Sequence, residues 1–426
     1  MSGELFSEEA SLVYNEACYQ GLNFAARDSL EPHVFELVSD AYAHMRRLTQ
    51  DQLFILSGAS GSGKSESAKF INDQLCILAS HAGRHNTRAQ HQLSHVTAVV
   101  EAFSNALTLE SRNSTRVGLW QEIQFNERGR ISGNKVVAFG LDRWRVSTRL
   151  AGERNFNIFY YLLHGATSAE RQKWQFRHSG DESWFTYLSC ERASKKLVAQ
   201  HVIKAAPPPP THYATMMDQL RMSLRACGIT PRMQNCIFQV LAAIMHLGNA
   251  EFADAGDKSE EAATVKNMEE IDFAAQFLGI STGALSAALT YKTTLVNNDL
   301  CTVFLNSLGA RNQRDALART LYHLVYYWLI DAVNQHLSDP DAVNHIAVLQ
   351  MYGFSGLALT KPGAASGTKA ANAGSFEQFA FNMANERLQG YVLREVLGDD
   401  CGISQELHDD SVGQLSVPWV HRLDCM

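Results

Sequence analysis

Residues 58–65 constrain the fold of this chain more than any other segment, because they place three glycines, a lysine and a serine at fixed spacing. They read Gly-Ala-Ser-Gly-Ser-Gly-Lys-Ser and fit the pattern GxxxxGK[ST] in full. The apolar run 53–56 precedes them and a helical pattern from about 64 to 79 follows, which predicts the order strand, loop, helix. Glycines let backbone N–H groups approach a phosphate, and a helix N-terminus favours negative charge. The predicted phosphate-binding residues are Gly58, Ala59, Ser60, Gly61, Ser62, Gly63, Lys64 and Ser65.

Two side chains of this loop have specific expected roles. Lys64 would neutralise the β- and γ-phosphates of a nucleotide, and the Ser65 hydroxyl would ligate Mg²⁺. Another class of phosphate-binding-loop protein, such as a GTPase or a small-molecule kinase, is the alternative at this point. A GTPase would need an Asn-Lys-x-Asp motif to read the base, and residues 134–137, Asn-Lys-Val-Val, do not provide it.

Composition indicates a globular protein and excludes some partners. The chain has 426 residues, of which 46% are hydrophobic and 19% charged, and its formal net charge of −7 predicts no attraction to nucleic acid. The eight cysteines show no CxxC spacing and the N-terminus has no signal-peptide pattern, which predicts a reduced, cytoplasmic protein. The longest apolar stretch, 321–333, contains His323 and Asp331 and is too short to span a bilayer, so direct membrane insertion is not expected.

The hydrophobic pattern predicts an α/β fold in which helices dominate the second half. Antiparallel strands are expected at 119–125 and 136–139, and a buried strand at 346–349. The proline run 207–210 predicts an extended linker, and 361–374 a flexible loop. Helices are expected at 32–48, 64–79, 211–227, 232–247, 267–278, 313–336 and 375–397.

The stretch 80–94 is rich in histidine and arginine and is interpreted as a surface loop. His81, His85, His91 and His95 form two i, i+4 pairs that could bind zinc on a helix. No acidic or thiol partner accompanies them, so the surface loop is the preferred interpretation.

Several segments after the glycine-rich loop resemble myosin motors and follow in the same order. Residues 111–118, Ser-Arg-Asn-Ser-Thr-Arg-Val-Gly, resemble switch I, and residues 152–163 resemble the helix that follows it. Residues 375–389 resemble the relay helix. Residues 300–305, 317–322 and 415–419 look most like the motor-like domain of fungal chitin synthases.

This resemblance implies a P-loop NTPase core of the myosin-motor type with a large helical subdomain that is similar to the upper 50-kDa region. Residues 1–426 would be one motor-like domain, incomplete at its C-terminus. Its expected parts are a core with the phosphate-binding loop and switch I at 1–150, the helical subdomain at 151–345, and the switch II strand with the relay-like helix at 346–426.

The resemblance also implies roles for residues outside the glycine-rich loop. Asn113 would contact the phosphates of ATP, and Thr115 would be the second hydroxyl ligand of Mg²⁺. Arg116 would be the switch I arginine. Ser114 and Gly353 would position the attacking water, while Lys64 stabilises the transferred phosphate.

Switch II departs from the myosin pattern. Myosins carry Asp-Ile-x-Gly-Phe-Glu, whereas residues 350–355 read Gln-Met-Tyr-Gly-Phe-Ser. Gln350 adds no negative charge near the metal, and Ser355 leaves Arg116 without the expected ionic partner. A lost charge-assisted bond of roughly 1.5–3 kcal/mol would slow hydrolysis by about one to two decades. ATP binding is therefore a firmer expectation than ATP hydrolysis.

The resemblance implies an ATP-binding motor-like module associated with actin filaments and belonging to a chitin-synthase-type protein. A pseudo-motor that binds ATP and serves as a tether or localisation module is the first alternative. The second is the front fragment of a chitin synthase, a UDP-GlcNAc glycosyltransferase, although no Gln-x-x-Arg-Trp motif is present. The catalytic region would be a partner if the chain continues. The expected location is the cytoplasm and cytoskeleton, and secretory vesicles or the plasma membrane through a linked region.

Overall fold

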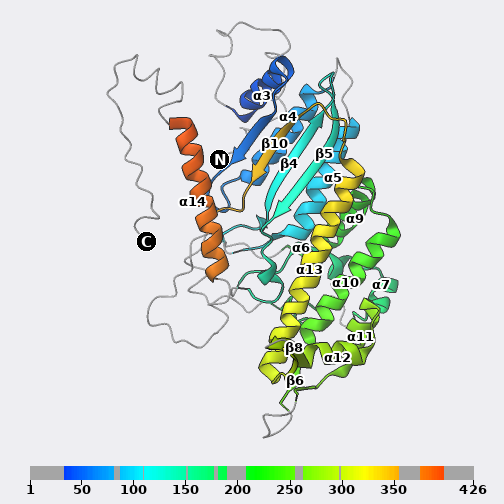
Figure 1. Cartoon of the computed structure of the whole chain (residues 1–426). Coiled ribbons are helices and arrows are strands. Elements are labelled where there is room, and N and C mark those ends of the chain that lie inside the picture. The colour runs from blue at the N-terminus through cyan, green and yellow to red at the C-terminus, as the bar shows by residue number, and fades with distance from the viewer. Residues whose placement is uncertain are drawn as a thin grey trace.

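The computed structural model describes residues 33–80, 87–108, 110–149, 152–176, 181–189, 208–254, 262–296, 299–354 and 375–397. It has a sheet flanked by helices at one end and an elongated helical part at the other, with α13 running between them (Figure 1). Ser355, His81, His85 and the segments 361–374 and 415–419 lie outside the described residues.

The largest sheet has four strands in the order β1-β10-β4-β5. β1 and β10 run parallel, with Gln52 opposite Ile346, whereas β10–β4 and β4–β5 are antiparallel. β1 and β10 therefore end at the same edge of the sheet, which is where parallel α/β proteins place their ligands. The bounds are β1 Gln52–Leu56, β4 Gly118–Phe125, β5 Ile131–Phe139 and β10 Asn344–Gln350.

Helices α3 and α4 pack against one face of this sheet. Ile123 and Phe125 of β4 and Ile346 and Val348 of β10 are at most 2% exposed and form a core with apolar residues of the two helices. Side chains that alternate along a strand point to opposite faces, which accounts for the i, i+2 spacing of both pairs. The bounds are α3 Val34–Leu48, α4 Lys64–Leu78 and α5 Thr87–Ser104.

The second part of the chain is built around the long helix α13 and the apolar helix α10. From Leu241 to Leu247 every residue of α10 is at most 1% exposed, so this half of the helix is surrounded by other elements and needs no polar face. The helices of this part are α6 Asn157–Gly165, α7 Ser168–Lys173, α9 Pro210–Ala226, α10 Pro231–Asn249, α11 Met268–Leu278, α12 Thr282–Thr290 and α13 Ser307–Leu337. Short 3₁₀ turns are η2 Arg143–Val146 and η3 Glu182–Trp184.

Three two-stranded pairings complete the described part of the chain, and α14, Ser375–Leu397, lies beside the large sheet (Figure 1). The first pairing lies next to the glycine-rich loop and the other two lie in the helical part. They are β2 Asn105–Ala106 with β3 Ser114–Thr115, β6 Phe252–Ala253 with β7 Thr264–Val265, and β8 Tyr291–Val296 with β9 Asp299–Phe304.

The mixed α/β content and all seven predicted helices are confirmed, although α13 begins six residues earlier than expected. The surface loop predicted at 80–94 is wrong in its second half, because α5 begins at Thr87; glutamine and arginine in this stretch are good helix formers. The linker predicted at 207–210 is also too long, since Pro210 is the first residue of α9, a position that suits proline. The β8–β9 hairpin was not predicted.

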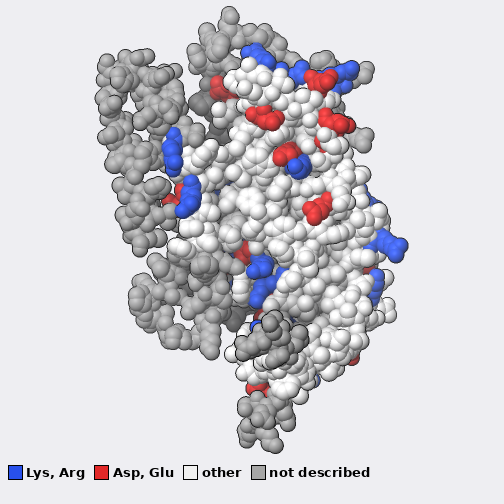
Figure 2. Space-filling model, in the orientation of Figure 1, with Lys and Arg blue, Asp and Glu red and all other residues white. Residues whose placement is uncertain are grey.

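Charged side chains of both signs are interspersed on the face that Figure 2 shows, without a broad basic area. Among the described helices, none is by itself long and apolar enough to cross a bilayer; α11 and α12 pass that test only as a pair bent by 113°.

Candidate functional site

The loop between β1 and α4 adopts the strained conformation that its glycines predict. Gly58, Gly61 and Gly63 have φ angles of 149°, 76° and 95°, a region that residues with a Cβ rarely enter. Gly63 caps α4 without a side-chain hydrogen bond. Because the first four N–H groups of a helix have no partner within it, those of α4 are available to an anion at this end.

A cleft with a volume of about 270 Å³ opens at this loop. The loop and the start of α4 form one wall, residues 111–115 form another, and residues 350–353 close the third. The structure thus brings together three segments that are far apart in the chain. Its lining includes Ser60, Gly61, Ser62, Gly63, Lys64, Ser65, Asn113, Ser114, Thr115 and Gly353, all predicted site residues.

Lys64 is folded back onto its own loop. Its Nζ donates hydrogen bonds to the carbonyl oxygens of Gly58 at 2.9 Å and Ala59 at 2.7 Å. Burial lowers the pKa of Lys64 from its ordinary value, since a partly buried ammonium is less well solvated. The ammonium group therefore lies in the cleft beside the turn of the loop.

Ser65 and Thr115 place two hydroxyl groups side by side. Their Oγ and Oγ1 atoms are 3.0 Å apart, and Gln350 at the end of β10 donates a hydrogen bond from Nε2 to Ser65 Oγ. Two neighbouring ligands of an octahedral Mg²⁺ ion, with bonds of about 2.1 Å, lie about 3.0 Å apart. The spacing of the two hydroxyls therefore suits the edge of a magnesium coordination shell, and their role as Mg²⁺ ligands stays a prediction.

The segment 111–116 is anchored on both sides of the predicted site residues. Ser114 and Thr115 form β3 and pair with Ala106 and Asn105 of β2, and both are less than 10% exposed. Asn113 accepts a hydrogen bond at Oδ1 from the Nδ2 of Asn157, the first residue of α6. The backbone of this segment is thus fixed by the β2–β3 pairing.

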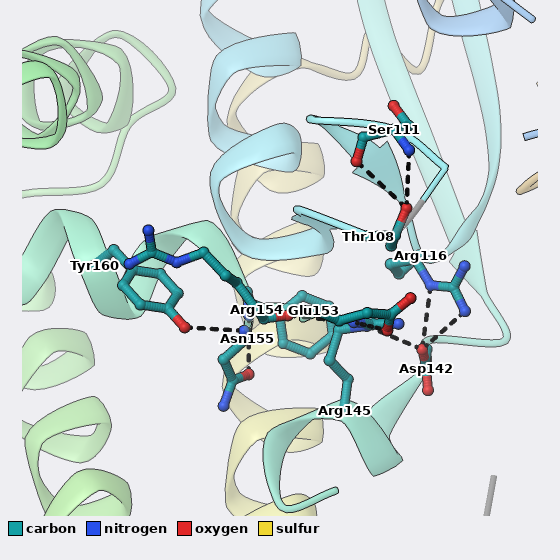
Figure 3. Close-up of polar contacts among 10 residues, drawn as sticks. Thr108, Ser111, Arg116, Asp142, Arg145, Glu153, Arg154, Asn155 and Tyr160 are labelled. Atoms are coloured by element: carbon teal, nitrogen blue, oxygen red, sulfur yellow. Dashed lines mark hydrogen bonds and ion pairs between the residues drawn. The ribbon is translucent and has the colours of Figure 1, made fainter. Parts of the chain in front are cut away.

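Arg116 lies in a buried network of four charges (Figure 3). Its Nε and Nη2 each lie 3.1 Å from Asp142 Oδ2, which is also 3.2 Å from the Nε of Arg145. Arg145 in turn donates from Nη1 to Glu153 at 2.9 Å. Burial would raise the pKa of Asp142, but the guanidinium groups of Arg116 and Arg145 outweigh it and hold that pKa below its ordinary value.

This network corrects one expectation. The sequence analysis left Arg116 without an ionic partner, whereas the structure gives it Asp142. Asp142 was missed because it lies 26 residues further along the chain, and no local spacing connects the two. The only sequence signal for this pairing was that Asp142 follows a strand pattern and stands three residues before Arg145.

Gly353 lies against the glycine-rich loop. A Cβ at this position would come closer than 3.0 Å to Ser60 N, Ala59 C and Lys64 Nζ, so only glycine fits. The neighbouring residue Phe354 accepts a hydrogen bond at its carbonyl from Ser60 N at 3.0 Å. The predicted proximity of Gly353 to the phosphate-binding loop is thus observed, although its predicted role with water remains a prediction.

Tyr352 connects the cleft to α14, which the sequence did not suggest. It is 3% exposed and packs edge-on against Phe381 of α14, with ring centroids 4.1 Å apart. Asn385 of the same helix donates from Nδ2 to the carbonyl of Tyr352 at 2.8 Å. On the other side, the guanidinium of Arg116 lies 5.6 Å from the centre of the Tyr352 ring.

The histidine pair of α5 gives no metal site. His91 and His95 stack at 6.3 Å, and His95 Nδ1 contacts Ser223 Oγ. Within the described ranges, no group of three or more histidine, cysteine or acidic side chains is arranged to bind a metal ion.

A family model for the myosin head (motor domain) matches residues 8–401 of the chain. The chain belongs to the myosin head family. Members of this family bind nucleotide with Mg²⁺ and interact with actin. The resemblance to myosin motors and to fungal chitin synthases, predicted from short segments, is confirmed over nearly the whole chain.

Curated relatives of this myosin head fall into two groups. It is 33% identical to chitin synthase 8 of Mycosarcoma maydis over 100% of its own length and 20% of that protein. It is 34% identical to chitin synthase 5 of Cryptococcus neoformans over 93% of its length and 19% of that protein. Myosin IC heavy chain of Dictyostelium discoideum is 32% identical over 90% of this chain and 31% of its own. The chain thus spans about a fifth of the length of the two chitin synthases.

Proposed function

We propose that this myosin head binds ATP with Mg²⁺ in the cleft between the glycine-rich loop, residues 111–115 and residues 350–353. The observation that carries the proposal is the pair of hydroxyls of Ser65 and Thr115, 3.0 Å apart beside an uncapped helix N-terminus. Such an arrangement offers both a metal edge and N–H donors for phosphate oxygens.

Each cleft residue then has a role that follows from its position. Lys64 exchanges its two carbonyl partners for phosphate oxygens, which attract an ammonium more strongly than neutral carbonyls do. Asn113, fixed by Asn157, presents its amide to the phosphates. Ser65 and Thr115 would hold Mg²⁺, which would neutralise phosphate charge when bound.

We propose that hydrolysis is slow. The carboxylate expected near the metal is replaced by Gln350, and Arg116 already forms an ion pair with Asp142. Ser114 and Gly353 would still place a water, but position 355, where myosins carry the glutamate that pairs with the switch I arginine, is serine. The main proposal is therefore an ATP-binding, motor-like module with slow turnover, in preference to a tether that does not hydrolyse ATP.

The binding proposal is tested by titrating the purified chain with ATP in an isothermal calorimeter. Lys64→Ala should weaken ATP binding by at least about tenfold, because it removes a charge that contacts phosphate. Lys135→Ala is the matched control, since Lys135 lies on β5 with a 44% exposed side chain. Equal ATP affinity of the Lys64→Ala variant and the wild type would contradict the proposal.

Hydrolysis and partners are tested separately. Restoring both carboxylates, in a Gln350→Asp/Ser355→Glu variant, should raise steady-state ATP turnover if these two positions account for the slow rate. We further propose that the module associates with actin filaments in the cytoplasm and is joined to a chitin synthase catalytic region. Co-sedimentation with filamentous actin, with and without ATP, tests the first of these; a chain that stays in the supernatant at all actin concentrations would count against it.

A further inference from the structure

The wall of the cleft where Mg²⁺ would bind consists of three neutral side chains in a row. Gln350 donates from Nε2 to Ser65 Oγ, and Ser65 Oγ lies 3.0 Å from Thr115 Oγ1. Gln350 is the last residue of β10 and is 9% exposed, so its amide is enclosed at this wall. The row therefore offers oxygen atoms to a cation without any negative charge.

The charge of the cleft lining is positive. Its cationic residues are Lys64 and Arg112, and the only acidic residue among those that line it is Glu66. The Glu66 side chain is 64% exposed and pairs with Lys69 at 3.0 Å. Glu101, which lines a neighbouring pocket together with Ser65, Thr115 and Gln350, pairs with Lys69 at 3.0 Å. Asp142 is paired with Arg116 and Arg145.

Mg²⁺ ordinarily binds proteins through one or two carboxylates together with the phosphates of the substrate. Here the protein supplies hydroxyls alone, and the Gln350 amide donates a hydrogen bond to one of them. A donated hydrogen bond occupies a lone pair of Ser65 Oγ and competes with the metal for that oxygen. The geometry of the site thus fits Mg²⁺, whereas its charge does little to attract it.

We propose that Gln350 makes nucleotide binding by this cleft nearly independent of Mg²⁺, with Lys64 and the N-terminus of α4 supplying most of the attraction for the triphosphate. This inference rests on the proposed ATP binding. In the absence of a metal, a carboxylate at position 350 would repel the triphosphate, whereas the amide does not. Glutamine in place of the aspartate of the myosin pattern therefore weakens the metal site and also removes the electrostatic penalty of binding ATP without a metal.

The test is the affinity for ATP measured by calorimetry in two buffers, one with excess Mg²⁺ and one with excess EDTA. The wild-type dissociation constant should change by less than about threefold between them. A Gln350→Asp variant should bind ATP at least about tenfold more tightly with Mg²⁺ than in EDTA, because the new charge attracts the cation and repels the bare triphosphate. The measured quantity is the equilibrium affinity for ATP, which does not depend on ATP hydrolysis.

Gln52→Asp is the matched control. It places the same new charge at the start of β1, where Gln52 lies opposite Ile346 and at the far end of the sheet from Gln350. This variant should retain the small Mg²⁺ dependence of the wild type. A wild-type chain that loses tenfold or more of its ATP affinity in EDTA would overturn the Mg²⁺ inference and leave ATP binding intact. A wild-type chain that binds no ATP in either buffer would overturn both.

Discussion

Replacing Asp142 by asparagine removes one charge from the buried network around Arg116. Asp142 Oδ2 has three close contacts, with Arg116 Nε and Nη2 at 3.1 Å and Arg145 Nε at 3.2 Å. The side chains are only 11%, 12% and 6% exposed for Arg116, Asp142 and Arg145. Asparagine has nearly the same shape and still offers one acceptor oxygen, so the substitution isolates the effect of charge.

The magnitude follows from the charge balance. Arg116 and Arg145 carry two positive charges and Asp142 and Glu153 carry two negative ones, so the wild-type network is neutral. The variant leaves one net positive charge in a site that is almost closed to water. Breaking a buried ion pair from one side destabilises a protein by about 3–5 kcal/mol, and the retained acceptor places the expected loss near the lower end, about 3 kcal/mol.

The assay is urea denaturation followed by circular dichroism, which gives the free energy of unfolding of each variant. Glu122→Gln is the control, because it is the same acid-to-amide change in a pair with the 44% exposed Lys135 at 3.5 Å. That change should cost less than about 1 kcal/mol. In a double variant, Arg116→Met with Asp142→Asn, the loss of unfolding free energy should be smaller than the sum of the two single losses by at least about 1.5 kcal/mol.

Two results would refute this reasoning. If Asp142→Asn costs no more than Glu122→Gln, the network does not depend on the Asp142 charge. If the effects of Arg116→Met and Asp142→Asn simply add, the loss arises at Asp142 independently of its pairing with Arg116, and the structural account of that arginine fails.

Three further outcomes are expected. Gly353→Ala should weaken ATP binding by at least about tenfold, because its Cβ would overlap the glycine-rich loop, whereas Gly283→Ala, whose Cβ meets nothing within 4 Å, should leave the calorimetric affinity unchanged. The pKa of Asp142 in the folded protein is lowered from its ordinary value of 3.8. The contribution of the ionised Asp142 to stability is therefore complete above that pH and is lost as the pH falls further. The stability difference between wild type and Asp142→Asn in urea should shrink below about pH 4. His246→Leu should cost about 1–3 kcal/mol in urea denaturation, because it leaves Glu270, now 2.6 Å from His246 Nδ1, without that partner; an unchanged midpoint would show that Glu270 finds another.

Much of the candidate cleft could be predicted, because its residues occur in short contiguous segments. The spacing of Gly58, Gly61 and Gly63 requires an unusual backbone, and the observed φ angles follow from it. Ser65 was assigned from the GxxxxGK[ST] pattern, and Thr115 and Gly353 through resemblance to myosin segments; the structure places all three on one cleft. Their roles with ATP and Mg²⁺ stay predictions.

The partner of Arg116 could not be predicted, because it is set by tertiary structure. A charged residue in a loop is paired only when the chain brings another charge to it, and the sequence near Arg116 contains no acidic residue at a helical or strand spacing. The β8–β9 hairpin had a clearer signal: Thr, Val and Tyr are frequent in strands, and Asn297-Asn298 stands between the two runs.

Two hydrogen bonds, one helical turn apart on α14, join this helix to residues that follow two strands of the large sheet. Asn385 bonds the carbonyl of Tyr352 just after β10, and Gln389 accepts a hydrogen bond from Ser57 just after β1. The two contacts are about 6 Å apart along the helix axis, and Ser375 at its start lies about 15 Å beyond Asn385. If one strand end moved by about 1 Å relative to the other, the helix would tilt by about 10°, and its start would move by about 2.5 Å. The two hydrogen bonds would thus convert a small displacement at the cleft into a larger displacement at the start of α14.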